Sequence, residues 1–179
     1  MIKYAKVIDE QKGLCEVGLG TNIMFYDSMG MSQLDVEQSD IDNKWYLIDK
    51  CPHKTTERLL QEAKENKISD NDIARDYALD AGVVYKDVLF DSDTDQKINL
   101  LAIISIMDEQ DTIVWFGKDN QSLNCNKSDL INIGELIARL QKFCWAKNSL
   151  IKAMILKAQS IKEVNSIAID YTVDESEEQ

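Results

Sequence analysis

One long apolar stripe constrains the fold of this chain more than any other feature of its sequence. Between residues 128 and 158 the side chains at two heptad positions are Leu130, Ile137, Cys144, Ile151 and Ala158, and Ile133, Leu140, Lys147 and Met154. Eight of these nine are apolar, which predicts a long amphipathic helix. Asn126 or Ser128 is placed to cap its N-terminus. Polar residues 147–149 interrupt the stripe, so we expect a kink or a break there.

The face of this helix must be covered, and the sequence favours cover by the chain itself. An apolar stripe about 100° wide typically packs on a sheet or helix of the same domain. An intermolecular seam is the alternative, and it would make the 128–158 helix the contact of a homo-oligomer. If the face is core, the buried side chains should be Trp115, Phe116, Leu130, Ile133, Ile137, Leu140 and Ile151.

Short elements flank the long helix, and together they predict a C-terminal α+β domain over residues 82–171, in which long helices cover a small antiparallel sheet. Residues 82–90 predict a hairpin or bent strand, and Asp93 is a cap for a helix from Gln96 to Met107. Residues 112–125 predict a second hairpin. Ser160 with Glu163 forms a capping-box pattern before a last short helix.

The first half of the chain predicts a different organisation. Alternating runs at 3–8, 14–17, 33–37 and 44–48 indicate a small antiparallel sheet, which makes residues 1–52 a β-rich module bounded by Pro52. Residues 53–81 form an acidic helical connector, which the polar cluster at 69–72 should divide into two helices. Residues 172–179 are an acidic tail. The fold class is therefore α+β.

Charge excludes several classes of partner. The chain carries 20 Lys and Arg against 32 Asp and Glu, a net charge of −12. Phosphate-rich ligands require clustered basic residues, so we expect no direct binding of nucleic acid or of an anionic membrane surface. No apolar run approaches the length of a membrane span, and residues 1–7 lack the apolar region of a signal peptide. We therefore expect the protein in a cytoplasm.

Chemistry-bearing residues are few. His53 is the single histidine, which excludes zinc motifs and catalytic triads that need two. The four cysteines form no CxxC pair, so we interpret them as reduced and mostly buried. Cys51 and His53 flank Pro52 and are interpreted as an ordinary loop, and residues 91–95 lack the glycine and distal glutamate of a calcium loop. We expect no enzyme activity, catalytic residue, cofactor or metal.

The second half nevertheless resembles a known family. The matching segments are GVVY at 82–85, VLFD at 88–91, a helix from Gln96, IVWF at 113–116 with DN at 119–120, SDL at 128–130 and AIDY at 168–171. In this order they resemble a C-terminal domain family of uncharacterised function found in tail-fibre and tail-fibre-assembly proteins of tailed phages and prophages. The segment from KYAKVI at 3–8 to WY at 45–46 is similar to N-terminal modules of prophage tail-region proteins.

This resemblance implies a role without supplying catalytic residues. The chain lacks the long fibrous segment of a fibre shaft. The resemblance therefore implies a tail-fibre-associated accessory or assembly protein, in the host cytoplasm or the virion tail. The charge suits an alternative, an anti-CRISPR-like acidic inhibitor that binds a basic groove of a host defence nuclease. Either role predicts a protein partner with a basic surface. The partner-binding residues expected on the connector are Glu57, Glu62, Glu65, Asp70, Asp72, Asp76 and Asp80.

Overall fold

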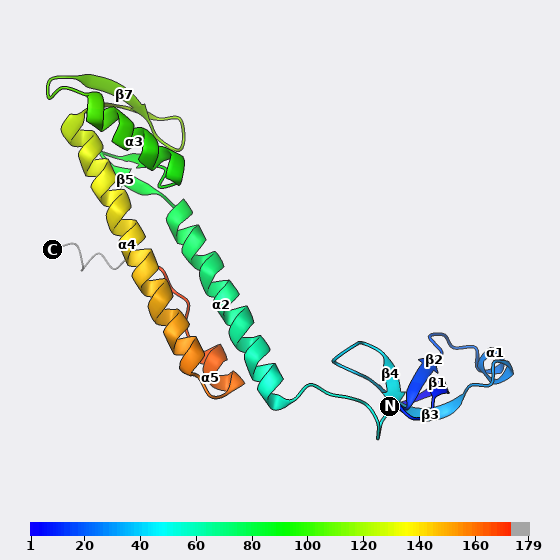
Figure 1. Cartoon of the computed structure of the whole chain (residues 1–179). Coiled ribbons are helices and arrows are strands. Elements are labelled where there is room, and N and C mark those ends of the chain that lie inside the picture. The colour runs from blue at the N-terminus through cyan, green and yellow to red at the C-terminus, as the bar shows by residue number, and fades with distance from the viewer. Residues whose placement is uncertain (173–179) are drawn as a thin grey trace. The chain divides into compact units, whose positions relative to one another are not determined.

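A computed structural model describes residues 1–172 and divides the chain into two compact units, Met1–Leu59 and the part from Leu60 onward (Figure 1). Helices and antiparallel strands occur in it together, which confirms the α+β class. Residues 173–179 of the acidic tail expected from the sequence lie outside the described part of the chain.

The first unit is a small closed barrel. Its strands are β1 (Ile2–Asp9), β2 (Leu14–Val17), β3 (Ser32–Gln38) and β4 (Trp45–Leu47), hydrogen-bonded in the order β1-β2-β4-β3, with β3 returning to β1. Every pair is antiparallel, and helix α1 (Ile23–Ser28) lies between β2 and β3 in the sequence. Ala5, Cys15 and Val36 point into the barrel, as the alternation of their strands requires. The four strands expected from the sequence therefore close on themselves.

The second unit is built along one long helix. Its elements are α2 (Thr56–Asp80, which enters the unit at Leu60), β5 (Val83–Tyr85), β6 (Val88–Phe90), α3 (Thr94–Ile106), β7 (Thr112–Phe116), β8 (Ser122–Asn126), α4 (Lys127–Lys157) and α5 (Ile161–Ser166). The strands form two separate hairpins, β5-β6 and β7-β8, where the sequence suggested one small sheet. In Figure 1, both hairpins and α3 lie beside the first half of α4, and α5 lies at its other end.

Local signals begin these elements as predicted. Asn126 caps α4 by accepting a hydrogen bond from the Asp129 amide, and the Asp129 carboxylate accepts one from the Asn126 amide. Asp93 caps α3 and Ser160 caps α5. The β5-β6 turn has positive φ at Lys86 and Asp87, 49° and 62°, which gives a two-residue turn the twist of its strands.

The apolar stripe of α4 is buried by its own chain in two places. Near the hairpins it joins the hairpin core, which consists of Val88, Phe90, Leu100, Met107, Cys125, Leu130, Ile133 and Ile137. Near its C-terminus it joins the terminal core, which consists of Ile151, Ile155, Ala158, Val164 and Ile167, with Leu60, Ala63 and Ile68 packed against it. Burial of these positions within the chain is therefore confirmed, and the homo-oligomer contact through the 128–158 helix stays a prediction.

The stripe turns around the helix as it runs along it, and this corrects part of the expected core. Because an α-helix has 3.6 residues per turn, a heptad pattern drifts by about 20° every seven residues. Asn148 and Ile155 are therefore buried where the heptad pattern pointed to Lys147 and Met154. Leu140 is only half-buried as a result. Outside the helix, Phe116 is 62% exposed and Trp115 half-buried, because β7 belongs to a two-stranded hairpin with an open face.

Two expected breaks are also absent. α4 runs unbroken through residues 147–149, and α2 runs unbroken through residues 69–72. Asn71 and Asp72 on α2 and Asn148 on α4 form hydrogen bonds between the two helices, so these side chains do not cap or interrupt the helix to which they belong. The four cysteines are free, as predicted, with Cys15, Cys125 and Cys144 buried.

Neighbouring residues Ile155 and Leu156 test the position of the terminal core. Ile155 is fully buried, whereas Leu156 is 60% exposed. We expect Ile155→Ala to lower the free energy of unfolding by about 2–5 kcal/mol. The control Leu156→Ala should change it by less than about 0.5 kcal/mol. Chemical denaturation of the full chain measures both, and equal losses would contradict the burial of this face.

Candidate functional site

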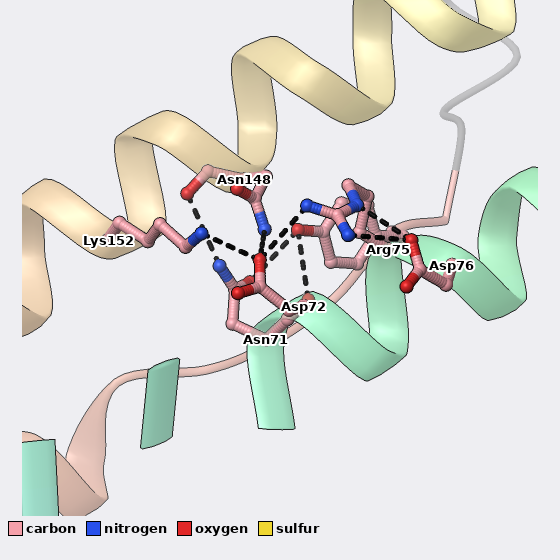
Figure 2. A network of polar contacts seen from close by, with 7 residues as sticks. Asn71, Asp72, Arg75, Asp76, Asn148 and Lys152 are labelled. Carbon is pink, nitrogen blue, oxygen red and sulfur yellow. Dashed lines mark hydrogen bonds and ion pairs between the residues drawn. The ribbon is translucent and has the colours of Figure 1, made fainter. Parts of the chain in front are cut away.

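The most connected polar cluster in the second unit joins the middle of α2 to α4 (Figure 2). The Asp72 Oδ1 atom accepts three hydrogen bonds, from Lys152 Nζ at 2.7 Å, Asn148 Nδ2 at 2.9 Å and Arg75 Nη1 at 3.0 Å. The Asn71 Nδ2 atom donates to the Asn148 backbone carbonyl at 3.2 Å. Asn71 and Asn148 are both buried, so each amide needs these partners. We call these residues, with Tyr171, the interhelix network.

The network extends to the end of the described chain and to the surface. Tyr171 Oη donates to Asn71 Oδ1 at 2.9 Å, which holds the segment after α5 against α2. Arg75 binds the Asp76 carboxylate through Nε at 2.9 Å and Nη2 at 2.7 Å. The Arg75 guanidinium also lies 4.7 Å from the centre of the Trp145 ring. A single arginine therefore contacts both helices.

These contacts fix the charge state of the network. The hydrogen bond from Lys152 is the main cause that holds the pKa of Asp72 below its ordinary value, with Asn148 and Arg75 adding to it. The hydrogen bond to Asp76 raises the pKa of Arg75. Both groups stay charged near neutral pH, and neither is suited to exchange protons there. The arrangement serves to join two helices in one register.

A buried carboxylate, that of Asp129, anchors the β5-β6 hairpin. The Asp129 Oδ1 atom accepts hydrogen bonds from Tyr85 Oη at 2.8 Å and from Lys86 Nζ at 2.7 Å. The bond from Lys86 is the main cause that lowers the pKa of Asp129, and burial opposes it. Since Asp129 also completes the cap of α4, one side chain joins the hairpin to the start of the helix.

The seven acidic residues proposed from the sequence do not behave as one surface. Asp72 belongs to the interhelix network, because it lies on the side of α2 that faces α4, and so it is not available as a free partner-binding charge. Glu57, Glu65, Asp70, Asp76 and Asp80 are exposed, and Glu62 is half-buried. Within this set Asp76 binds Arg75, and Asp80 lies 3.4 Å from Lys118 Nζ. Their role in partner binding stays a prediction.

One face of α2 combines exposed charge with exposed apolar area. Tyr77 is 74% exposed and Ile73 is 51% exposed. Asp70, Asp76 and Asp80 flank them, since residues three and four apart along a helix are neighbours. We call these five residues the acidic face of α2. Its carboxylates were predicted from the sequence and its apolar centre was not, although Ile73 and Tyr77 have the spacing of one helix face.

An apolar groove of about 430 Å³ lies elsewhere in the second unit, between α3 and α4. Leu100, Leu101, Ile104, Ile131 and Ala138 line it, and Lys97 and Glu135 stand at its edge. A Cβ atom at Gly134 would meet no atom within 4 Å, so the groove is open there. Nothing in the described residues 1–172 shows what would occupy this groove.

The first unit brings together three residues whose side chains can act as metal ligands. Glu37, Cys51 and His53 each place one ligand-type atom within 4.8 Å of the others. Burial and the carboxylates of Glu37 and Asp40 raise the pKa of the Cys51 thiol. Cys51 and His53 were interpreted from the sequence as an ordinary loop, with no metal expected. Glu37 was not predicted, because it lies 14 residues from Cys51 and reaches the pair only where β3 passes beside the loop.

The geometry defines the second unit as an α+β domain in which two hairpins and three helices pack along one long helix. Residues 62–173 match the model of a family described as domain of unknown function (DUF4376), and the chain belongs to this family. No curated protein and no solved structure matches the chain. Within residues 1–172, we find no helix with both the length and the apolar character needed to cross a bilayer.

The pH dependence of stability tests the interhelix network. Asp72→Asn removes the charge that Lys152 and Arg75 bind, and we expect it to cost about 1–2 kcal/mol at pH 7, because the side chain is about one-third exposed. The pKa of Asp72 is lowered by folding, so its stabilisation is complete above about pH 4 and is lost as the pH falls through the folded value.

Denaturation from pH 7 to pH 2 measures this effect, and Asp70→Asn is the matched control on the exposed side of the same helix. The difference between wild type and Asp72→Asn should shrink at the acidic end, whereas Asp70→Asn should follow wild type throughout. A constant difference across the range would contradict the assignment.

Proposed function

We propose that this protein acts by binding another protein, as an accessory or assembly protein of phage or prophage tail fibres, and that it catalyses no reaction. The tail assignment is supported by the resemblance of residues 80–171 to the C-terminal domains of tail-fibre and tail-fibre-assembly proteins. The family description assigns no function, so this resemblance carries the biological setting.

The acidic face of α2 is the observation that carries protein binding. Tyrosine is enriched among residues that dominate interface energies, and Tyr77 stands 74% exposed beside Ile73. The carboxylates of Asp70, Asp76 and Asp80 surround this apolar centre. A partner that covers it must present an apolar pocket framed by Lys or Arg, because like charges across an interface are costly. We therefore propose a basic surface of a tail component as the partner.

The state of the titratable groups supports the absence of catalysis in the second unit. A general acid or base works best with a pKa near the working pH. In the interhelix network the pKa of Asp72 is lowered and that of Arg75 is raised, so both move away from neutrality. Their carboxylate and guanidinium groups are engaged in joining the helices.

The charge favours a second candidate, an acidic inhibitor that occupies the basic nucleic-acid groove of a host defence nuclease. The net charge of −12 and the exposed carboxylates along α2 suit such a groove. Both candidates place the protein in the host cytoplasm, and only the first is compatible with a place in virions as well. Peptide mass spectrometry of purified particles, with inhibition assays on the nuclease, distinguishes the two.

Replacement of Tyr77 tests the proposed surface. We expect Tyr77→Ala to weaken binding to the tail-fibre protein of the same phage or prophage by about 2 kcal/mol, or roughly 30-fold in Kd. Leu156→Ala is the control, since Leu156 is likewise exposed, at 60%, but lies on α4 outside the acidic face of α2. Titration calorimetry measures both. Equal affinities for the two variants would remove the acidic face of α2 from the interface.

Charge reversal tests the electrostatic part of the surface. We expect Asp70→Lys to lower the association rate and to weaken its dependence on salt, because exposed charges act mainly on encounter. Asp119→Lys makes the same charge change at an exposed position outside α2 and should leave the rate near wild type. Stopped-flow association at several ionic strengths measures this, and identical salt dependence in all three proteins would refute a basic partner.

A further inference from the structure

Hydrogen bonds hold the loop after β4 against the end of β3. The Ser39 hydroxyl donates to the Pro52 carbonyl at 2.7 Å, and the Lys54 amide donates to Asp40 Oδ1 at 2.9 Å. The Cys51 thiol lies 3.7 Å from the Glu37 carbonyl oxygen. Pro52 fixes its own φ angle between Cys51 and His53. The positions of Cys51 and His53 relative to Glu37 are therefore set by the fold of the barrel.

The distances in this cluster suit a shared ion better than direct hydrogen bonds. His53 Nε2 lies 3.6 Å from Glu37 Oε2, which is beyond the ordinary range for a nitrogen–oxygen hydrogen bond. In a tetrahedral zinc site with bonds of about 2.1 Å, neighbouring ligand atoms lie about 3.4 Å apart. All three ligand atoms are within 4.8 Å of one another, a spread that small side-chain rotations can close.

We propose that Glu37 Oε2, Cys51 Sγ and His53 Nε2 bind a single Zn²⁺ ion, with the fourth position open to water. The set of one thiolate, one imidazole and one carboxylate favours zinc over calcium or magnesium, which take oxygen ligands. The proposal concerns the first unit alone and is independent of the partner-binding function.

Asp40 is the positioning residue of this site. Its Oδ1 atom lies 3.8 Å from His53 Nδ1, on the opposite side of the ring from Glu37. A small rotation of the imidazole would bring Nδ1–H within hydrogen-bond distance of this carboxylate, which would orient the ring with Nε2 toward the ion. Asp40 is itself held by the Lys54 amide. With an ion bound, the four residues would form the carboxylate–histidine–metal arrangement common in zinc proteins.

Cobalt binding tests the site directly, because Co²⁺ takes zinc geometry and reports thiolate ligation through a near-ultraviolet charge-transfer band. The full chain is stripped with EDTA, exchanged into metal-free buffer and titrated with Co²⁺. We expect one equivalent to produce the charge-transfer band and one equivalent of Zn²⁺ to abolish it. Absence of the band at saturating Co²⁺ would overturn the proposal.

Variants assign the ligands. Cys51→Ser should abolish the charge-transfer band, and His53→Gln should weaken Zn²⁺ binding at least about tenfold. Asp40→Asn should weaken it by about 10-fold to 100-fold while the band remains, which separates a positioning residue from a ligand. Glu16→Gln, an exposed carboxylate on β2, is the control and should bind as wild type. Unchanged binding in both Cys51→Ser and His53→Gln would place any ion elsewhere and refute the site.

Thiol protection provides a readout that does not depend on variants. Under native conditions iodoacetamide should modify Cys51 first, since the other three cysteines are buried. One equivalent of Zn²⁺ should slow that modification at least about tenfold, and EDTA should restore it. Peptide mass spectrometry locates the label, and a Cys51 rate that is indifferent to Zn²⁺ would contradict coordination by its sulfur.

Discussion

The organisation of the second unit depends on the interhelix network, which forms a polar layer between α2 and α4 around Asp72 and Asn148. Apolar cores lie on both sides of this layer along α4, and apolar contacts alone would let two helices slide against each other. A buried amide left without partners costs about 1–3 kcal/mol, so a shift of one turn would be penalised at Asn71 and Asn148 together. The layer thereby selects one register, as a single buried asparagine does in a coiled coil.

Because the register is fixed, each side of α2 has a different role. Asn71 faces α4 and is fully buried, whereas Ile73 and Tyr77 face away from it and are exposed. The carboxylates divide in the same way: Asp72 is used internally, and Asp70 is left on the surface. An excess of acidic residues on one helix therefore serves both the assembly of the unit and the surface available to a partner.

Features that depend on neighbours in the sequence were predictable, and features that depend on distant partners were not. The caps at Asp93, Asn126 and Ser160 follow from short local patterns, and so do the two hairpins. The breaks expected near Asn71 and Asn148 were wrong because each polar run has a partner 77 residues away that no local pattern reveals. The approach of Glu37 to Cys51 likewise depends on how the barrel closes.

The two cores on α4 differ in how far apart their residues lie along the chain, and this orders their assembly. The hairpin core draws its buried members from the continuous stretch 88–137, so none of its contacts closes a loop longer than that stretch. The terminal core needs α2 to return to the end of α4, as in the contact between Lys64 and Leu156, which are 92 residues apart. Loop-closure entropy grows with that separation and slows non-local contacts. The hairpin core can therefore nucleate the unit, and α4 then serves as the template on which α2 and α5 dock.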